Sequence, residues 1–341
     1  MKSHTVPRKL LEQFAYDDPV TRSKRLWRYQ KGRPPYGRAA PKTAARRGGH
    51  FADPANSTKE AELEERLKRE FEDPVNQFID MIGYRTFTLT AAHIRLLTGY
   101  ITVLFNRTRA RRAASDGQSN IMIEALRALL SDDQKLSDLA AKLTMDMVNS
   151  GYQLRRMVTK QEIIDGIKRE IARHTNDDEA QRSYIQTMET MMAFADETML
   201  NGHWGIVHTE PNKPFVLGDA PVVTWERSAS NILMFGQGFA RSNVEALLPV
   251  SPTACLHVLP LVERSRPVRT PAPEEVNMAQ AAFATEHCFT NVCSPEIDAT
   301  LQPQFGKVRL GIEGFSLRHV DYNKVLFDIL LGRRPHVAAP R

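Results

Sequence analysis

The hydrophobic positions near the N-terminus change their spacing, and the change predicts a helix followed by a strand. Leu10, Leu11 and Phe14 recur at helical spacing after Pro7. Proline suits the first position of a helix, because its missing N–H would have no partner there. Residues 25–31, RLWRYQK, then alternate in the manner of a strand. We therefore expect a short amphipathic helix and a strand within the first 31 residues.

Helical periodicity dominates residues 57–200. Ser57-Thr58-Lys59-Glu60 has the form of a capping box, and a hydrophobic stripe follows it up to an interruption at Pro74. A longer helix is expected from about residue 88 to 112, ending in a cluster of arginines. Its inward positions are Ala92, Leu96, Leu97, Tyr100, Val103 and Leu104. Methionines farther along recur at helical spacing and are interpreted as core residues.

Beyond Gly202 the pattern changes to short β-type runs separated by proline and glycine. These runs are WGIVHT, PFVLGD, PVVTW, EALLPVSP, CLHVLPL and, after one helix at 273–288, CFTNVC. Residues 33–51 are rich in proline, glycine, alanine and arginine, so a loop or a docked edge segment is expected there.

Together these patterns predict an α+β fold, in which a helical middle is flanked by strands from the N- and C-terminal parts that share one mixed sheet. We expect a single domain over residues 1–330 and a loose tail at 331–341. Within the domain the expected parts are a basic N-terminal segment (1–56), a helical region (57–200) and a strand-rich region (201–330).

Charge is distributed unevenly along the chain. Residues 1–50 hold 13 lysines and arginines against three acidic residues, a net charge of +10, whereas the remainder holds 33 against 37, a net charge of −4. Such a segment suits a polyanion, and Trp27, Tyr29 and Tyr36 lie among the cations as groups that could stack on single-stranded bases. The alternative is a solvated arm that docks on the acidic body.

Several classes of protein are not supported. No apolar run is long enough for a membrane helix, and no secretory signal is expected. Three cysteines without a CxxC pair predict free thiols and a cytoplasmic protein. No nucleotide-binding glycine motif occurs, and His203 and His208 fall on opposite faces of a strand. We therefore expect no cofactor and no metal site, while the oligomeric state stays open.

Short stretches spread over some 280 residues resemble, in their order, a family called domain of unknown function 4238. They are His4-Thr5-Val6-Pro7 with Leu11 and Phe14, Leu26-Trp27-Arg28-Tyr29-Gln30-Lys31, Arg107-Thr108, Trp204, Asp219-Ala220-Pro221, Leu248-Pro249-Val250-Ser251-Pro252 and Asn277. The chain departs from the family pattern in lacking an aromatic residue near Thr5 or Lys9, and in having Gly218 where a serine is usual. The resemblance implies candidate positions but no reaction.

Three of these positions form a candidate site. His4 has a pKa range suited to acid–base chemistry, Asp219 could orient it, and Arg107 could bind an anion. Contacts to a substrate are expected from Arg8, Trp27, Arg28, Thr108 and Trp204. Each catalytic candidate also has a structural interpretation, because the histidine could cap a helix, the aspartate could hold a turn, and the arginine could balance a helix C-terminus.

Three hypotheses for function follow. The first is a protein associated with nucleic acid through residues 1–50, with phosphodiesterase or nuclease activity at His4, Asp219 and Arg107. The second is a hydrolase or transferase that uses the same residues on a small anionic substrate. The third is an interaction protein or scaffold without chemistry. The uneven charge favours the first hypothesis, because it is read directly from the sequence.

Overall fold

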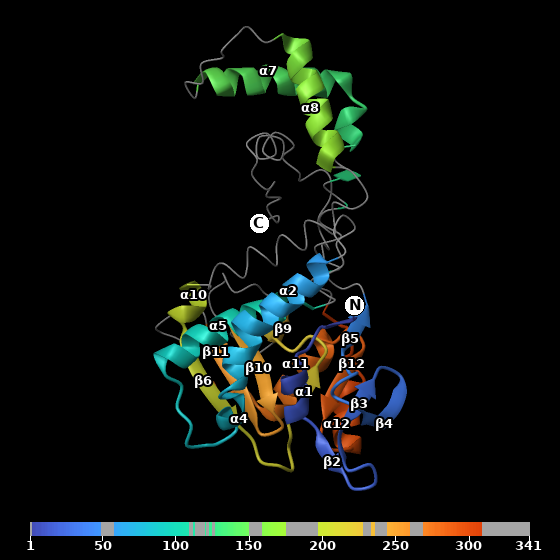
Figure 1. Cartoon of the computed structure of the whole chain (residues 1–341), viewed down its shortest axis with the longest axis vertical. Coiled ribbons are helices and arrows are strands. Elements are labelled where there is room, and N and C mark those ends of the chain that lie inside the picture. The colour runs from blue at the N-terminus through green and yellow to red at the C-terminus, as the bar shows by residue number, and fades with distance from the viewer. Residues whose placement is uncertain are drawn as a thin grey trace. The chain divides into compact units, whose positions relative to one another are not determined.

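A computed structural model of the chain (Figure 1) describes residues 2–48, 58–108, 112, 120, 123–124, 127–149, 159–174, 197–227, 233–235, 244–259 and 269–308. The chain divides into two compact units. One consists of Met1–Ala113 with Ile185–Leu310, and the other of Ala114–Tyr184 with Gly311–Arg341. The division into two units does not test the single domain expected over residues 1–330, which stays a prediction.

The N-terminal segment folds into regular elements. Strand β1 (Lys2–His4) leads into helix α1 (Arg8–Gln13), followed by strands β2 (Tyr16–Asp18), β3 (Ser23–Gln30), β4 (Arg33–Ala39) and β5 (Arg46–Gly48). The short helix and the strand at RLWRYQK are thereby confirmed. Residues 33–51 were expected as a loop or an edge segment. Among the described strands, β4 pairs with β3 alone and is therefore an edge strand. Pro34 and Pro35 are tolerated there because an edge strand leaves backbone groups without ladder partners.

The first sheet joins strands from both ends of the chain. Its order is β2-β3-β12-β7, with β4 on β3, where β12 is His287–Thr290 and β7 is Leu217–Gly218. The predicted pairing of N- and C-terminal strands is confirmed, since Cys288 lies opposite Tyr29 on one side and Gly218 on the other. Every pairing is antiparallel, so the sheet is not the mixed sheet that the sequence suggested.

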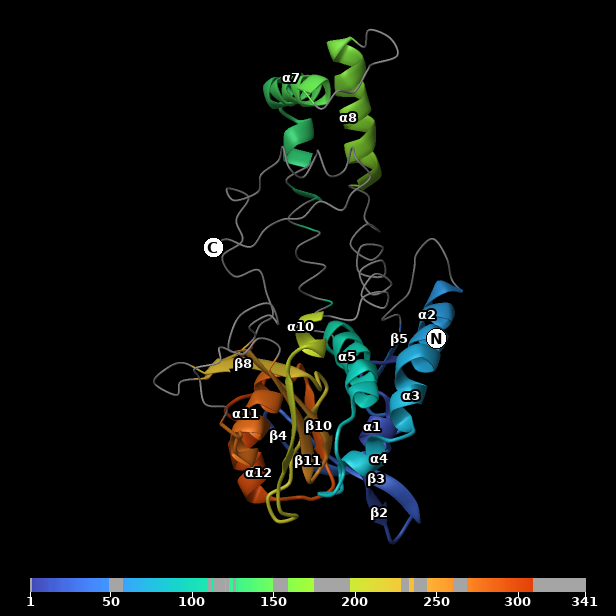
Figure 2. The ribbon, with the colours of Figure 1, turned by 90° about the vertical axis from the view of Figure 1, so that its left-hand side faces the viewer.

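A second sheet is built from strands after residue 202, in the order β6-β11-β10-β8-β9. These strands are β6 (His203–His208), β8 (Val223–Arg227), β9 (Leu233–Phe235), β10 (Val244–Ser251) and β11 (Ala254–Leu259). Strands β10 and β11 lie between helix α5 (Ala91–Asn106) on one side and helix α11 (Pro273–Phe283) on the other (Figure 2). Because both faces are covered, nearly every side chain of β10 is buried, as the continuous apolar run predicts. The α+β class is confirmed.

The helical layer before α5 departs from the prediction. It consists of α2 (Lys59–Leu67), a π-helix η1 (Lys68–Glu72), α3 (Asp73–Asn76) and α4 (Ile79–Ile82). The N-cap of α2 is Thr58, and its hydroxyl donates to Glu62 instead of capping a backbone N–H. The interruption expected at Pro74 begins six residues earlier, where the helix widens into η1.

Helix α5 is shorter than predicted and ends at Asn106, with Arg107 as its C-cap. Its N-terminus carries the capping box of the region, in which Thr90 and His93 exchange hydrogen bonds. Leu97, Tyr100 and Leu104 are buried as expected, whereas Ala92 and Leu96 are exposed. The described remaining helices are α7 (Asp133–Asn149), α8 (Lys160–His174), α10 (Glu197–Leu200) and α12 (Pro295–Leu301). In the described residues, no helix combines the length and apolarity that crossing a membrane requires.

Side chains of α11 bind the backbone of the segment at 214–221, which contains β7. Asn277 accepts from the N–H of Val216 at 2.8 Å and donates to the carbonyl of Pro214 at 2.9 Å. Gln280 accepts from Gly218 at 2.7 Å and donates to Pro221 at 2.9 Å. A Cβ atom at Gly218 would lie 2.9 Å from the Gln280 carbonyl oxygen, so only glycine fits this close approach.

Replacing Asn277 by alanine should destabilise the protein strongly. The change leaves one buried N–H and one buried carbonyl without their partner, which costs about 2–4 kcal/mol in unfolding free energy. Urea unfolding of wild type and Asn277→Ala measures this difference. The control is Glu274→Ala on the same helix, which removes only an exposed ion pair to Lys213 and should cost less than about 1 kcal/mol. Equal effects of the two changes would contradict the structural role of Asn277.

Candidate functional site

Strands β3 and β4 carry an exposed group of cations around one tyrosine. Tyr36 lies opposite Arg28 across the two strands, and the Arg28 guanidinium carbon is 5.3 Å from the centroid of the Tyr36 ring. Tyr36 is 49% exposed. Lys24 on β3, Lys31 between the two strands and Arg33 on β4 are also exposed. We call Lys24, Arg28, Lys31, Arg33 and Tyr36 the hairpin face. It presents a cation–π pair and three solvated cations, the groups that bind phosphates and bases.

Trp27, also a predicted contact residue, has a different environment. Its ring stacks on Tyr16 with centroids 6.2 Å apart, and Gly37 lies against it so closely that a Cβ atom would be 2.8 Å from the ring. The Tyr16 hydroxyl donates to the Gly37 carbonyl and fixes the same corner. Trp27 therefore contributes packing between β2, β3 and β4, and the ring most accessible to a ligand on this hairpin is Tyr36.

Arg107 is fully buried and paired with acidic side chains from the preceding helices. Its Nη1 donates to Glu72 at 2.6 Å, and its Nη2 lies 3.8 Å from Glu64. Burial disfavours the charged guanidinium, but the two carboxylates outweigh this effect and raise the pKa of Arg107. Burial and then the Glu72 charge raise the pKa of the neighbouring Tyr100 phenol. The arrangement ties α5 to α2 and η1, and it commits the arginine to internal carboxylates.

Asp219 follows β7 and accepts three backbone hydrogen bonds. Its carboxylate binds the N–H groups of Thr285 at 2.7 Å, Glu286 at 2.9 Å and His287 at 3.2 Å, and its own N–H donates to the His287 carbonyl. A carboxylate bound in this way holds the turn between α11 and β12. Asp219 thus belongs to the same sheet as Trp27 and Arg28, while Arg107 contacts α2 and η1.

The remaining predicted residues are distributed over the fold. The backbone of His4 ends β1 opposite Arg46, and its side chain lies outside the described residues, so the catalytic assignment stays a prediction. Thr108 is buried and donates to the Phe105 carbonyl at 3.3 Å. Trp204 donates from its indole nitrogen to the Met199 carbonyl at 2.8 Å. Both of these side chains have internal partners.

A pocket of about 400 Å³ brings the predicted Arg8 together with the carboxylates that hold Arg107. It lies between α1 and the layer formed by α2, η1 and α3. Its lining comprises Arg8, Lys9, Glu12, Ala61, Glu64, Glu65, Lys68, Glu72, Asp73 and Asn76. Of these residues the sequence predicted only Arg8, and the other nine were missed. For Lys68, Glu72, Asp73 and Asn76 the available signal was the charged stretch KREFEDPVN, in which a helical stripe runs into a proline.

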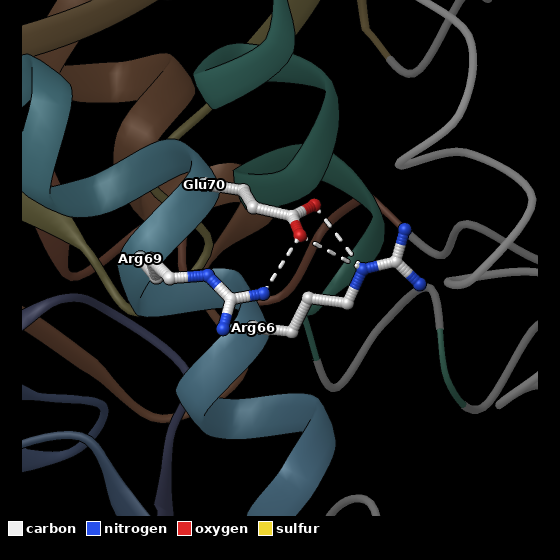
Figure 3. Close-up of polar contacts among 3 residues, drawn as sticks. All are labelled: Arg66, Arg69 and Glu70. Carbon is white, nitrogen blue, oxygen red and sulfur yellow. Dashed lines mark hydrogen bonds and ion pairs between the residues drawn. The ribbon is translucent and has the colours of Figure 1, made fainter.

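The π-helix η1 holds two carboxylates in different environments. Glu72 lines the pocket and binds buried Arg107, whereas Glu70 lies between Arg66 and Arg69 at 3.1 Å from each (Figure 3). Burial raises the pKa of Glu70, but hydrogen bonds and charges from the two arginines outweigh it and lower that pKa. Glu70 is not among the pocket residues, so it offers a matched carboxylate outside the pocket on the same short helix.

All three cysteines are free, and Cys255 and Cys288 are buried whereas Cys293 is exposed. Burial raises the pKa of Cys255, and burial followed by the Asp219 charge raises that of Cys288. A thiol held in its protonated form is a poor nucleophile. Among the described residues, no three histidine, cysteine or acidic side chains are grouped as a metal ion would need.

Tyr29, a further motif residue, ties the first sheet to α12. Its hydroxyl donates to the Val292 carbonyl at 3.1 Å and accepts from the Ser294 N–H at 3.0 Å. Ser294 is the N-cap of α12, so the phenol fixes where that helix begins. Burial raises the pKa of Tyr29 to about 12.

Comparison with known proteins identifies one family. The family described as "Protein of unknown function (DUF4238)" matches residues 2–293. No curated protein and no solved structure matches the chain.

Removing the Arg107 charge should destabilise the protein, because Glu72 and Glu64 would remain partly buried without their cation. We expect Arg107→Ala to lower the unfolding free energy by about 3–5 kcal/mol. Urea unfolding at neutral pH measures the effect. Arg107→Lys, which keeps the charge but not the planar guanidinium, should recover part of it. A destabilisation as large in the lysine variant as in the alanine variant would show that charge pairing is not what holds this site.

Alkaline pH should weaken the protein through Tyr29. Because its pKa is raised above the ordinary value of 10.0, its contribution to stability is complete below that pH and is lost as the pH rises toward 12. The unfolding free energy of wild type should therefore fall more steeply between about pH 10 and about pH 12 than that of Tyr29→Phe, which cannot ionise there. Tyr84→Phe, at a 65% exposed tyrosine, serves as the control and should follow wild type. Equal slopes for wild type and Tyr29→Phe would contradict this effect.

Proposed function

Because the chain belongs to the family of proteins of unknown function DUF4238, membership supplies no activity, and we propose that the protein binds single-stranded nucleic acid through the hairpin face. The observation that carries the proposal is the half-exposed Tyr36 ring with the Arg28 guanidinium 5.3 Å from its centroid. A tyrosine ring held in this way can stack on any base, which makes such recognition tolerant of sequence.

The charge around Tyr36 supports a polyanionic ligand. Lys24, Lys31 and Arg33 are exposed, and the first 50 residues carry a net charge of +10. Phosphate binding by such cations releases counterions and gives a steep dependence on salt. Single-stranded nucleic acid is favoured over a duplex as the ligand, because stacking on Tyr36 needs a base whose face is accessible.

Burial at the predicted catalytic positions favours binding over cleavage. Arg107 is 0% exposed and Asp219 is 5% exposed, and both side chains bond to internal groups. A phosphodiester or a small anionic substrate would have to displace these partners before reaching either side chain. We therefore propose a binding protein first, and nuclease activity at His4, Asp219 and Arg107 is tested in the same assay.

Tyr36→Ala should weaken binding of a labelled oligothymidylate or oligouridylate. Removing the stacking of one base costs about 1–3 kcal/mol, which corresponds to a roughly 5- to 150-fold higher Kd. Fluorescence anisotropy at several salt concentrations measures it. Tyr84→Ala is the matched control, because Tyr84 is 65% exposed and lies outside the hairpin face. Equal effects in both variants would contradict the assignment to this face.

The salt series separates charge from stacking. Arg33→Ala should reduce the slope of log K against log salt by about 0.7 for each phosphate that the protein no longer neutralises, whereas Tyr36→Ala should leave that slope unchanged. If wild type cleaves the oligonucleotide and a folded His4→Ala variant does not, the protein is a nuclease, and the proposal of a binding function without cleavage is wrong. Absence of binding at low salt would overturn the proposal.

A further inference from the structure

We propose that the pocket between α1 and the α2–η1–α3 layer binds a small organic cation bearing primary amine or guanidinium groups. Its volume of about 400 Å³ lies at the lower end of the range for small-molecule sites. Five of its lining residues are acidic and three are basic. This site is separate from the hairpin face and does not depend on the proposed nucleic-acid binding.

The cations of the lining are mostly engaged by carboxylates. Arg8 binds Glu12 at 2.6 Å, and Lys9 binds Asp80 at 2.9 Å. Gln13 donates to the same Asp80 and holds α1 in place against α4. An incoming anion would have to compete with these carboxylates for each cation.

Two of the carboxylates that line the pocket are not engaged by a cation among the described residues. In the part of the chain that the structure describes, Glu65 and Asp73 form no ion pair, and both are exposed. A ligand rich in N–H donors and carrying positive charge satisfies both carboxylates. The side-chain oxygen of Asn76 is buried beneath the pocket surface and is not one of the groups that such a ligand contacts.

The backbone of the pocket wall gives an independent reason to expect a ligand. Lys68 and Glu72 are the first and last residues of the π-helix η1, and Asp73 and Asn76 belong to the helix that follows it. A π-helical segment is rare and is found frequently at functional sites. Here it places Glu72, one of the lining residues, in a hydrogen bond to buried Arg107, which holds this part of the pocket wall in place without a ligand.

Isothermal titration calorimetry with agmatine and with putrescine, at about 0.15 M salt, tests the proposal. Wild type should bind at least one of the two probes. In the double variant Glu65→Gln with Asp73→Asn, the Kd for that amine should be about tenfold higher than in wild type, or more. The double variant is compared with wild type by urea unfolding, so that weaker binding is assessed on folded protein.

Glu70→Gln is the matched control, because it removes a carboxylate of η1 that does not line the pocket. It should leave the Kd within about twofold of wild type. An equal effect in Glu70→Gln would overturn the proposal in favour of general attraction to an acidic surface. Binding of inorganic phosphate without binding of either amine would overturn the choice of a cation.

The two proposals fail separately. Tyr36→Ala should retain amine binding, and the double variant at Glu65 and Asp73 should retain oligonucleotide binding. Disappearance of both activities in either variant would contradict the separation of the two sites. If neither amine gives a heat of binding, the inference is overturned, whereas the proposal for the hairpin face is not affected.

Discussion

The backbone of residues 214–221 is the constraint on which the larger unit depends. This segment forms β7 in the first sheet, and its Phe215 N–H also bonds to Pro252 in the turn between β10 and β11 of the second. Its other polar groups are bound by Asn277 and Gln280 from α11, while Asp219 at its end binds the turn before β12. One buried stretch of chain therefore joins both sheets and the helix between them. Buried backbone groups must find partners, and here side chains supply those that a neighbouring strand would otherwise provide.

Several elements could be predicted because local spacing determines them. Leu10, Leu11 and Phe14 define the buried face of α1, and the alternation at RLWRYQK predicts the strand β3. Leu26 and Tyr29 lie on opposite faces of that strand, and both are buried because each face is covered. The environment of Arg107 could not be predicted in this way. Its partner Glu72 lies 35 residues earlier, at the end of η1, where the helical phase changes before Pro74. Helical periodicity does not reveal such a change. The sequence therefore allowed Arg107 to be interpreted as a cation at a helix C-terminus, although it forms a buried ion pair.

The positions that carry the family resemblance serve mainly to hold the fold together. Tyr29 fixes the start of α12, Asp219 fixes a turn, and Asn277 binds the backbone of the segment that contains β7. Of the proposed ligand contacts, Arg28 and Lys31 belong to these positions, whereas Tyr36 on the edge strand and Glu65 on α2 lie outside them. A scaffold that holds some ligand contacts outside its structural positions is consistent with the general independence of fold and function.

The contact between Gly218 and Gln280 sets how closely α11 can approach β7. A side chain at position 218 would meet the carbonyl oxygen of Gln280 at 2.9 Å. The obstructing atom belongs to the backbone, so shortening the side chain at position 280 would not make room. Any residue other than glycine at position 218 would therefore require helix and strand to move apart. The spacing between this helix and its sheet thus depends on the absence of a single methyl group.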